Sequence, residues 1–203
     1  MKDRPQRPDS ELEGSAKDVK YEIEMMLESA SDIGCGWASL PTTLSDKRKN
    51  MALECFLLHY RNLRAFLCPS LQSPTPQSKP PRDDDILASD FLGKPTWEDV
   101  GDKTKIGDDK QRLDQMLAHL SYNRLNEFKA KGNTYWYTAR MAVAMLKEVY
   151  SFLAALPTYM KFWFPDQDTL AKERALMEAQ ALTELPLTTT TSVVQFTRYH
   201  RPK

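Results

Sequence analysis

The stretch KQRLDQMLAHLSYNRLNEF, residues 110–128, decides the fold of this chain. Leu113, Leu117 and Leu120 recur in it at steps of four and three. At about 3.6 residues per turn, these steps place the three leucines near one face of a helix. An apolar face of this kind has to pack against other elements of a core. The stretch therefore predicts a core helix, and similar patterns elsewhere predict an all-α protein.

Helical patterns recur along most of the chain. Apolar residues at helical spacing, bounded by capping and helix-breaking residues, mark five further segments. The four long helices favour an up-and-down four-helix bundle, with an extra short helix and a C-terminal helix beside it. The predicted helices are, in chain order, residues 16–31, 45–68, 85–92, 110–128, 134–156 and 168–185.

The two ends and one loop differ in composition from the helices. Residues 1–14 are polar, and we expect a disordered lead. Residues 69–83 are rich in proline and predict a surface loop. Residues 15–185 then form one helical bundle domain, and residues 186–203 form an extended, β-prone tail. A lone strand in this tail either pairs with its copy in a dimer or stays loose.

The composition restricts the class of protein. Of the 203 residues, 41% are hydrophobic and 28% are charged, which fits one globular domain with polar ends. The formal net charge is zero, so any RNA binding needs a local basic patch. The three cysteines form no CxxC pair. The N-terminus lacks the apolar core of a signal peptide, and no apolar run could span a membrane. We expect a cytoplasmic protein without a membrane partner.

Motifs for cofactors and metals are missing from the sequence. It contains no GxGxxG, P-loop, HExxH or GxSxG pattern, so we expect no cofactor and no metal. Asp83, Asp84 and Asp85, with Asp90 nearby, are carboxylates of the kind that bind divalent cations. We favour another interpretation, in which they form an acidic N-cap of the helix predicted at 85–92.

Two side chains of the central stretch carry chemistry. Arg112 and His119 are seven positions apart, which places them within about 20° of each other around a helix. Asn123 shares their strip. An arginine holds phosphate oxygens with a forked pair of donors, and a histidine moves a proton near neutral pH. Together they could serve the cleavage of a phosphodiester. The alternative is that both are ordinary side chains at the edge of the core.

An Arg followed by six residues and a His, on a helix of an all-helical chain, resembles the motif of the HEPN superfamily (higher eukaryote and prokaryote nucleotide-binding). This resemblance implies a metal-independent RNase or an RNA-binding module, of the kind found in bacterial defence and toxin systems. It makes Arg112 the phosphate-binding residue and His119 the proton-transfer residue. It also implies RNA as a partner and a homodimer that pairs the two motifs. Three stretches further resemble uncharacterised bacterial helical proteins: FLLHYRNLRAFL (56–67), DDILASDF (84–91) and AHLSYNR (118–124).

His59 lies in the middle of the apolar face of the helix predicted at 45–68. A histidine among aliphatic and aromatic residues is usually buried, with a hydrogen-bonded ring nitrogen. In the functional alternative, His59 meets Arg112 or His119 across a helix pair and supports the site. Asn62 and Asn123 are further candidates for such a supporting role.

The sequence also allows a second function, which depends on an aromatic segment near the C-terminal end of the bundle. The stretch TYMKFWFP, residues 158–165, follows the last bundle helix and is strongly aromatic. An exposed aromatic patch is typical of a protein-binding surface. The alternative to an RNase is therefore a non-enzymatic helical interaction or regulatory protein that binds a partner through residues 159–164.

Overall fold

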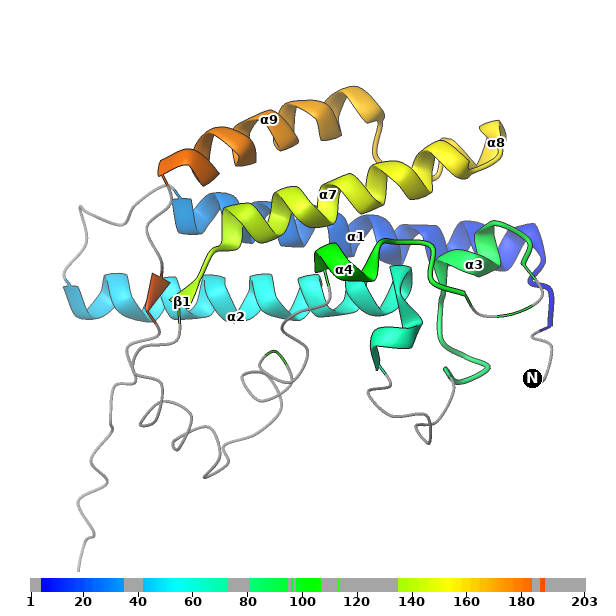
Figure 1. Ribbon diagram of the computed structural model, residues 1–203, viewed down its shortest axis with the longest axis horizontal. Coiled ribbons are helices and arrows are strands. Elements are labelled where there is room, and N and C mark those ends of the chain that lie inside the picture. The colour runs from blue at the N-terminus through cyan, green and yellow to red at the C-terminus, as the bar shows by residue number, and fades with distance from the viewer. Residues whose placement is uncertain are drawn as a thin grey trace, which may run out of the picture.

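The structure is a computed structural model, which describes residues 5–34, 42–72, 81–94, 96, 98–106, 113, 135–183 and 187–188. The described part of the chain is mostly helical, which confirms the all-α class (Figure 1). The elements are, in chain order, α1 (Asp9–Gly34), α2 (Thr42–Leu67), the 3-10 helix η1 (Pro69–Gln72), α3 (Ala88–Phe91), α4 (Lys103–Ile106), β1 (Tyr135–Trp136), α7 (Thr138–Ala155), α8 (Thr158–Lys161), α9 (Gln167–Thr183) and β2 (Leu187–Thr188).

The two longest helices, α1 and α2, form an antiparallel pair, and α7 and α9 pack beside them (Figure 1). The buried side of α1 follows the apolar spacing of its sequence. Residues three or four apart in a helix share one face, so this spacing produces a continuous stripe. The buried apolar residues of α1 are Leu12, Ala16, Val19, Ile23, Met26, Leu27 and Ala30.

The core also fixes one residue of the central stretch. Leu113 is fully buried and belongs to the same apolar cluster as residues of α1, α2 and α7. This agrees with the leucine face expected for residues 110–128, whose other residues lie outside the described part of the chain. The four-helix, up-and-down topology depends on that helix and therefore stays a prediction.

Four phenylalanines join the smaller elements to the bundle. The rings of Phe66, Phe91, Phe152 and Phe164 meet edge to face, with centroids 5.1–5.9 Å apart. They come from α2, α3, α7 and the turn after α8. Edge-to-face aromatic packing adds to the stabilisation from burial alone. Through Phe91, the cluster anchors the short helix α3 to the bundle.

The helix boundaries differ from the prediction at both ends of the bundle. We expected 1–14 to be disordered, but α1 begins at Asp9 and buries Leu12, so the prediction is wrong for residues 9–14. Pro8 starts this helix, because its carbonyl accepts the N–H groups of Glu11 and Leu12. At α9 the capping residue is Asp166, whose carboxylate accepts the Thr169 N–H at 2.8 Å.

The prediction that Asp83, Asp84 and Asp85 form the N-cap of a helix is wrong. The short helix α3 begins at Ala88, and its N-cap position is Leu87 rather than an aspartate. Asp90 reaches back and accepts the Leu87 N–H at 3.1 Å, while Asp85 accepts the Arg82 N–H at 2.7 Å. The carboxylate that accepts the backbone N–H at the N-cap position of α3 therefore belongs to a residue of the helix itself, Asp90.

A two-residue part of the predicted β-prone tail forms a strand that pairs within the chain, and residues 189–203 lie outside the described part of the chain. We expected a strand in the tail to pair with a second copy or to stay loose. Residues Leu187 and Thr188 pair antiparallel with Trp136 and Tyr135 of the same chain. This short ladder ties the segment after α9 to the start of α7. The described helices include none that is both long and apolar enough to cross a membrane.

Candidate functional site

The structure separates the predicted site residues into two groups. Arg112, His119 and Asn123, which include the predicted catalytic pair, lie outside the described residues. His59 and Asn62, the supporting candidates, both lie on α2 and are described. The structure brings these two together around a carboxylate of α1.

This carboxylate belongs to Glu22. One of its oxygens lies 2.6 Å from His59 Nδ1, and Asn62 Nδ2 donates to both oxygens at 3.1 Å. His59 is buried, and the ring of Tyr21 meets it edge to face at 5.5 Å. The prediction of a buried His59 with a bonded nitrogen is confirmed.

The chemistry of this cluster follows from the donors and acceptors. An ionised carboxylate only accepts hydrogen bonds, so Nδ1 of His59 carries the proton that faces Glu22. In a neutral ring, Nε2 is then an acceptor. The arrangement fixes the orientation and tautomer of the ring, as a carboxylate does for a catalytic histidine. The prediction that His59 meets Arg112 or His119 concerns residues outside the described part of the chain.

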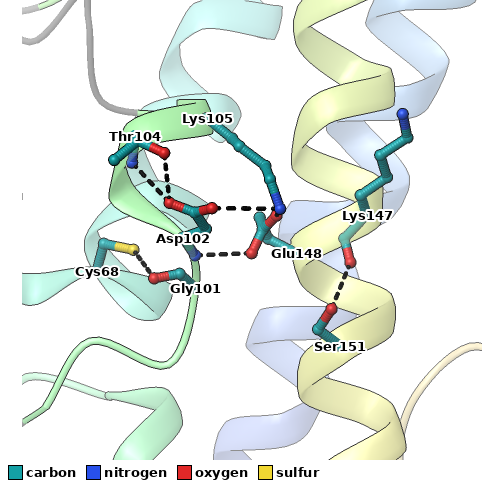
Figure 2. Close-up of polar contacts among 8 residues, drawn as sticks. All are labelled: Cys68, Gly101, Asp102, Thr104, Lys105, Lys147, Glu148 and Ser151. Carbon is teal, nitrogen blue, oxygen red and sulfur yellow. Dashed lines mark hydrogen bonds and ion pairs between the residues drawn. The ribbon is translucent and has the colours of Figure 1, made fainter.

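A second polar cluster lies where the chain approaches the central stretch. The segment from Glu98 to Ile106 packs across the end of α2 and the side of α7 (Figure 2). The Leu67 carbonyl accepts the N–H groups of Val100 and Gly101 at 2.8 and 3.1 Å. Gly101 suits this close approach, since a Cβ there would lie 3.1 Å from Cys68 Sγ and 3.2 Å from Leu67 Cβ, so these neighbours would have to shift.

Glu148 of α7 is the centre of this second cluster. Its side chain is only 5% exposed, and it accepts the Asp102 N–H at 2.7 Å and Lys105 Nζ at 3.3 Å (Figure 2). The pKa of Lys105 is raised, because the carboxylates of Asp102 and Glu148 accept hydrogen bonds from its ammonium. The buried carboxylate therefore holds α4 against α7.

Asp102 itself caps α4. Its carboxylate accepts the Thr104 hydroxyl at 2.6 Å and the Thr104 N–H at 2.9 Å. These hydrogen bonds, the hydroxyl first, hold the pKa of Asp102 below its usual value. Four residues after this cap, Ile106 is buried, and Leu113 is buried again seven residues later. The core thus contains one residue shortly before the central stretch and one residue within it.

Cys68 is not suited to act as a nucleophile. Its thiol is buried and donates to the Gly101 carbonyl at 3.1 Å. Burial raises the pKa of this thiol from 9.0 to about 12, and the negative charge of Asp99 adds to the shift. The thiolate is the reactive form, so a thiol with this pKa is inert near neutral pH.

The sequence did not single out Glu22, Glu148 or the short helix α4. Glu148 stands between Lys147 and Val149 in a helix that is apolar on most sides, and this position was the available signal. A carboxylate on a buried face needs a donor, so its presence implied a packed polar partner. Nothing in the sequence identified Asp102 and Lys105 as those partners.

Comparison with known proteins gives no match from which a function could be inferred, so the proposed function rests on the sequence motif and on the geometry described above. No protein-family model, no curated protein and no solved structure matches the chain. Within the described residues, no group of three or more histidine, cysteine, aspartate or glutamate side chains is arranged to hold a metal ion.

Proposed function

We propose that the protein is a HEPN-like, metal-independent RNase that acts as a homodimer, in the class associated with bacterial defence and toxin systems. The observation that supports this proposal is the complete burial of Leu113 in the helical core. Leu113 directly follows Arg112 and belongs to the leucine face of the stretch. With that face inward, helical geometry puts Arg112 and His119 on a flanking strip rather than in the core.

The proposed reaction needs a base and a phosphate ligand. His119 takes the proton of a ribose 2′-hydroxyl, the 2′-oxygen attacks phosphorus, and the bond from phosphorus to the 5′-oxygen breaks. The leaving 5′-oxygen takes up a proton. The products are a 2′,3′-cyclic phosphate and a 5′-hydroxyl. Arg112 binds the phosphate oxygens, on which charge develops during the attack.

The supporting residues act through orientation. Glu22 fixes the ring of His59, and Asn62 fixes Glu22. In this proposal the rigid α1–α2 pair presents His59 to the catalytic strip, and Asn123 extends that strip by one helical turn. His59 is then a positioning residue, and its loss reduces activity less than the loss of His119.

The test is RNA cleavage in EDTA by the wild type, His119→Ala and Arg112→Ala. We expect each variant to lose about 100-fold or more of the rate, as removal of a general base or a transition-state ligand typically does. Asp114→Ala is the matched control. Asp114 lies two positions after Arg112 and five positions before His119, which places it roughly 140–160° from both around the same helix, so this change leaves the proposed site intact.

Circular dichroism of each variant separates a lost site from a lost fold. If folded His119→Ala cleaves RNA as fast as the wild type and Asp114→Ala, the proposed catalytic role is wrong. A rate per molecule that does not rise as the protein dimerises would contradict the paired-motif arrangement.

The exposed aromatic residues favour a second candidate function, a non-enzymatic interaction protein. Phe162 is 85% exposed and Tyr159 is 50% exposed, whereas Met160 and Phe164 of the same stretch are buried. Of the aromatic surface predicted for residues 159–164, Tyr159 and Phe162 are exposed, while Phe164 belongs to the core. Phe162→Ser should abolish partner binding and leave RNA cleavage unchanged, and His119→Ala should do the reverse.

A further inference from the structure

A groove runs between α1 and α9. It has a volume of about 320 Å³, and buried apolar side chains form its floor, among them Ile23, Leu27 and Leu170. Four carboxylates line it: Glu24, Glu28 and Asp32 from α1, and Glu173 from α9. A site with an apolar floor and a charged rim selects amphipathic ligands of the opposite charge.

The groove carries a net negative charge. Among the described residues that line it, none is lysine, arginine or histidine. Glu24 has a distant ion pair with Lys20, at 3.7 Å along the same helix. On α9, the ion pair of Arg174 with Glu178 lies outside the groove. A cationic group entering the groove would therefore meet carboxylates from two helices.

The end of this chain has the complementary composition. Residues 193–203, VVQFTRYHRPK, contain Arg198, Arg201 and Lys203 and no carboxylate side chain. Val193, Val194 and Phe196 supply apolar groups next to these cations. The segment thus offers an apolar part for the floor and positive charges for the rim.

The segment is long enough to reach the groove of its own molecule. A side chain at Gly34 would lie 2.8 Å from Gln180, so the end of α1 touches α9 there. Gln180 and Thr188 are eight residues apart, which limits their separation to about 29 Å. The groove extends along α1 from Asp32 to Ile23, about 14 Å. The 15 residues after Thr188 span about 50 Å when extended.

We propose that residues 193–203 bind in the α1–α9 groove of the same chain, as a built-in ligand that a cationic partner segment would have to displace. The tethering keeps the effective concentration of the segment high, so weak charge pairs suffice to hold it. This inference is independent of the proposed RNase activity, because it uses neither Arg112 nor His119.

Trypsin tests the proposal on the intact protein. Arg201 precedes Pro202, which blocks cleavage, so the bond after Arg198 is the site in the tail that trypsin cleaves. Release of residues 199–203 is followed by mass spectrometry. We expect Glu28→Gln/Glu173→Gln to release this peptide roughly fivefold faster than the wild type, the factor expected when two exposed charge pairs are lost. Glu13→Gln, an exposed carboxylate elsewhere on α1, should match the wild type.

A second variant, with its change in the tail rather than in the groove, tests the proposal even if the double variant misfolds. Phe196→Ser removes the apolar anchor, leaves the Arg198 site unchanged and should also speed release. Raising the salt should accelerate release from the wild type, because exposed charge pairs are screened. Equal rates for the wild type, the double variant and Phe196→Ser would overturn the proposal. Protection that increases with protein concentration would also overturn it, since the tail would then occupy a second copy.

Discussion

Two carboxylates hold this fold together in different ways. Glu22 lies between α1 and α2 with a side chain that is 23% exposed, and its partners His59 and Asn62 both belong to α2. Glu148 is 5% exposed and holds a backbone N–H and a lysine from a segment more than 40 residues away. The first connects two helices that already pack along their length. The second connects a short helix, α4, to the side of a long one.

The difference predicts which carboxylate matters more. A buried hydrogen-bonding group that loses its partner keeps the full cost of removal from water, whereas a half-exposed group regains water. The Asp102 N–H depends on the buried Glu148, whereas Glu22 is partly exposed and its partner Asn62 lies at the surface, although its other partner, His59, is buried. We therefore expect larger effects at the Glu148 cluster than at the Glu22 cluster.

The largest expected effect is that of Glu148→Ala. It leaves the Asp102 N–H without its acceptor and opens a space beside α7, so the free energy of unfolding should fall by about 2–3 kcal/mol. Urea denaturation measures this loss. Lys147→Ala, at the exposed neighbouring position, should change stability by about 0.5 kcal/mol or less. Similar losses in both variants would contradict the stabilising role of the Glu148 carboxylate.

The next effect concerns pH and Cys68. Because the thiol pKa is raised from 9.0 to about 12 by folding, the unfolded chain releases this proton first as the pH rises. Stability should therefore fall above pH 9, by about 1.4 kcal/mol between pH 8 and pH 10 from this group alone.

Urea denaturation of the wild type and Cys68→Ala at the two pH values isolates this contribution. The advantage of the wild type should shrink at pH 10, while the difference between the wild type and Cys55→Ala serves as the control for a cysteine outside the cluster. A constant difference for Cys68→Ala would mean that burial does not raise the pKa of this thiol.

The smallest effect is expected for Glu22→Ala. His59 is buried, but two of the three lost hydrogen bonds come from Asn62, which is exposed and can be rehydrated, so the loss should be about 1 kcal/mol. A double-mutant cycle with Asn62→Ala should show coupling, because Asn62 donates to both oxygens of Glu22. Glu13→Ala on the exposed side of α1 is the control. A loss equal to that of Glu148→Ala would contradict the comparison.

The fold class could be predicted because helical spacing is a local property. The apolar residues of α1 and α7 repeat at three and four positions, and the stripes that they form are buried as this spacing requires. Leu113 of the central stretch is buried as well. The start of α1 was missed because residues 1–14 are polar overall, and a single residue, Leu12, provides the burial there. Composition averages hide such isolated contacts.

The polar clusters could not be predicted, because they join residues far apart in the sequence. Glu22 and His59 are 37 positions apart, and Lys105 and Glu148 are 43 apart. Their partnership depends on how α1, α2, α4 and α7 pack. The burial of His59 could be inferred from its apolar neighbours, but the identity of its partner could not. The intramolecular pairing of β1 and β2 was missed for the same reason.

The measurement that tests the proposed function most directly is the chemical form of the RNA ends produced in EDTA. We predict fragments that carry a 2′,3′-cyclic phosphate and a 5′-hydroxyl, and none of them when His119→Ala replaces the wild type. Mass spectrometry of a short synthetic RNA distinguishes these ends. Fragments with a 3′-hydroxyl, or an RNA left intact by the folded wild-type protein, would contradict the proposed role of Arg112 and His119.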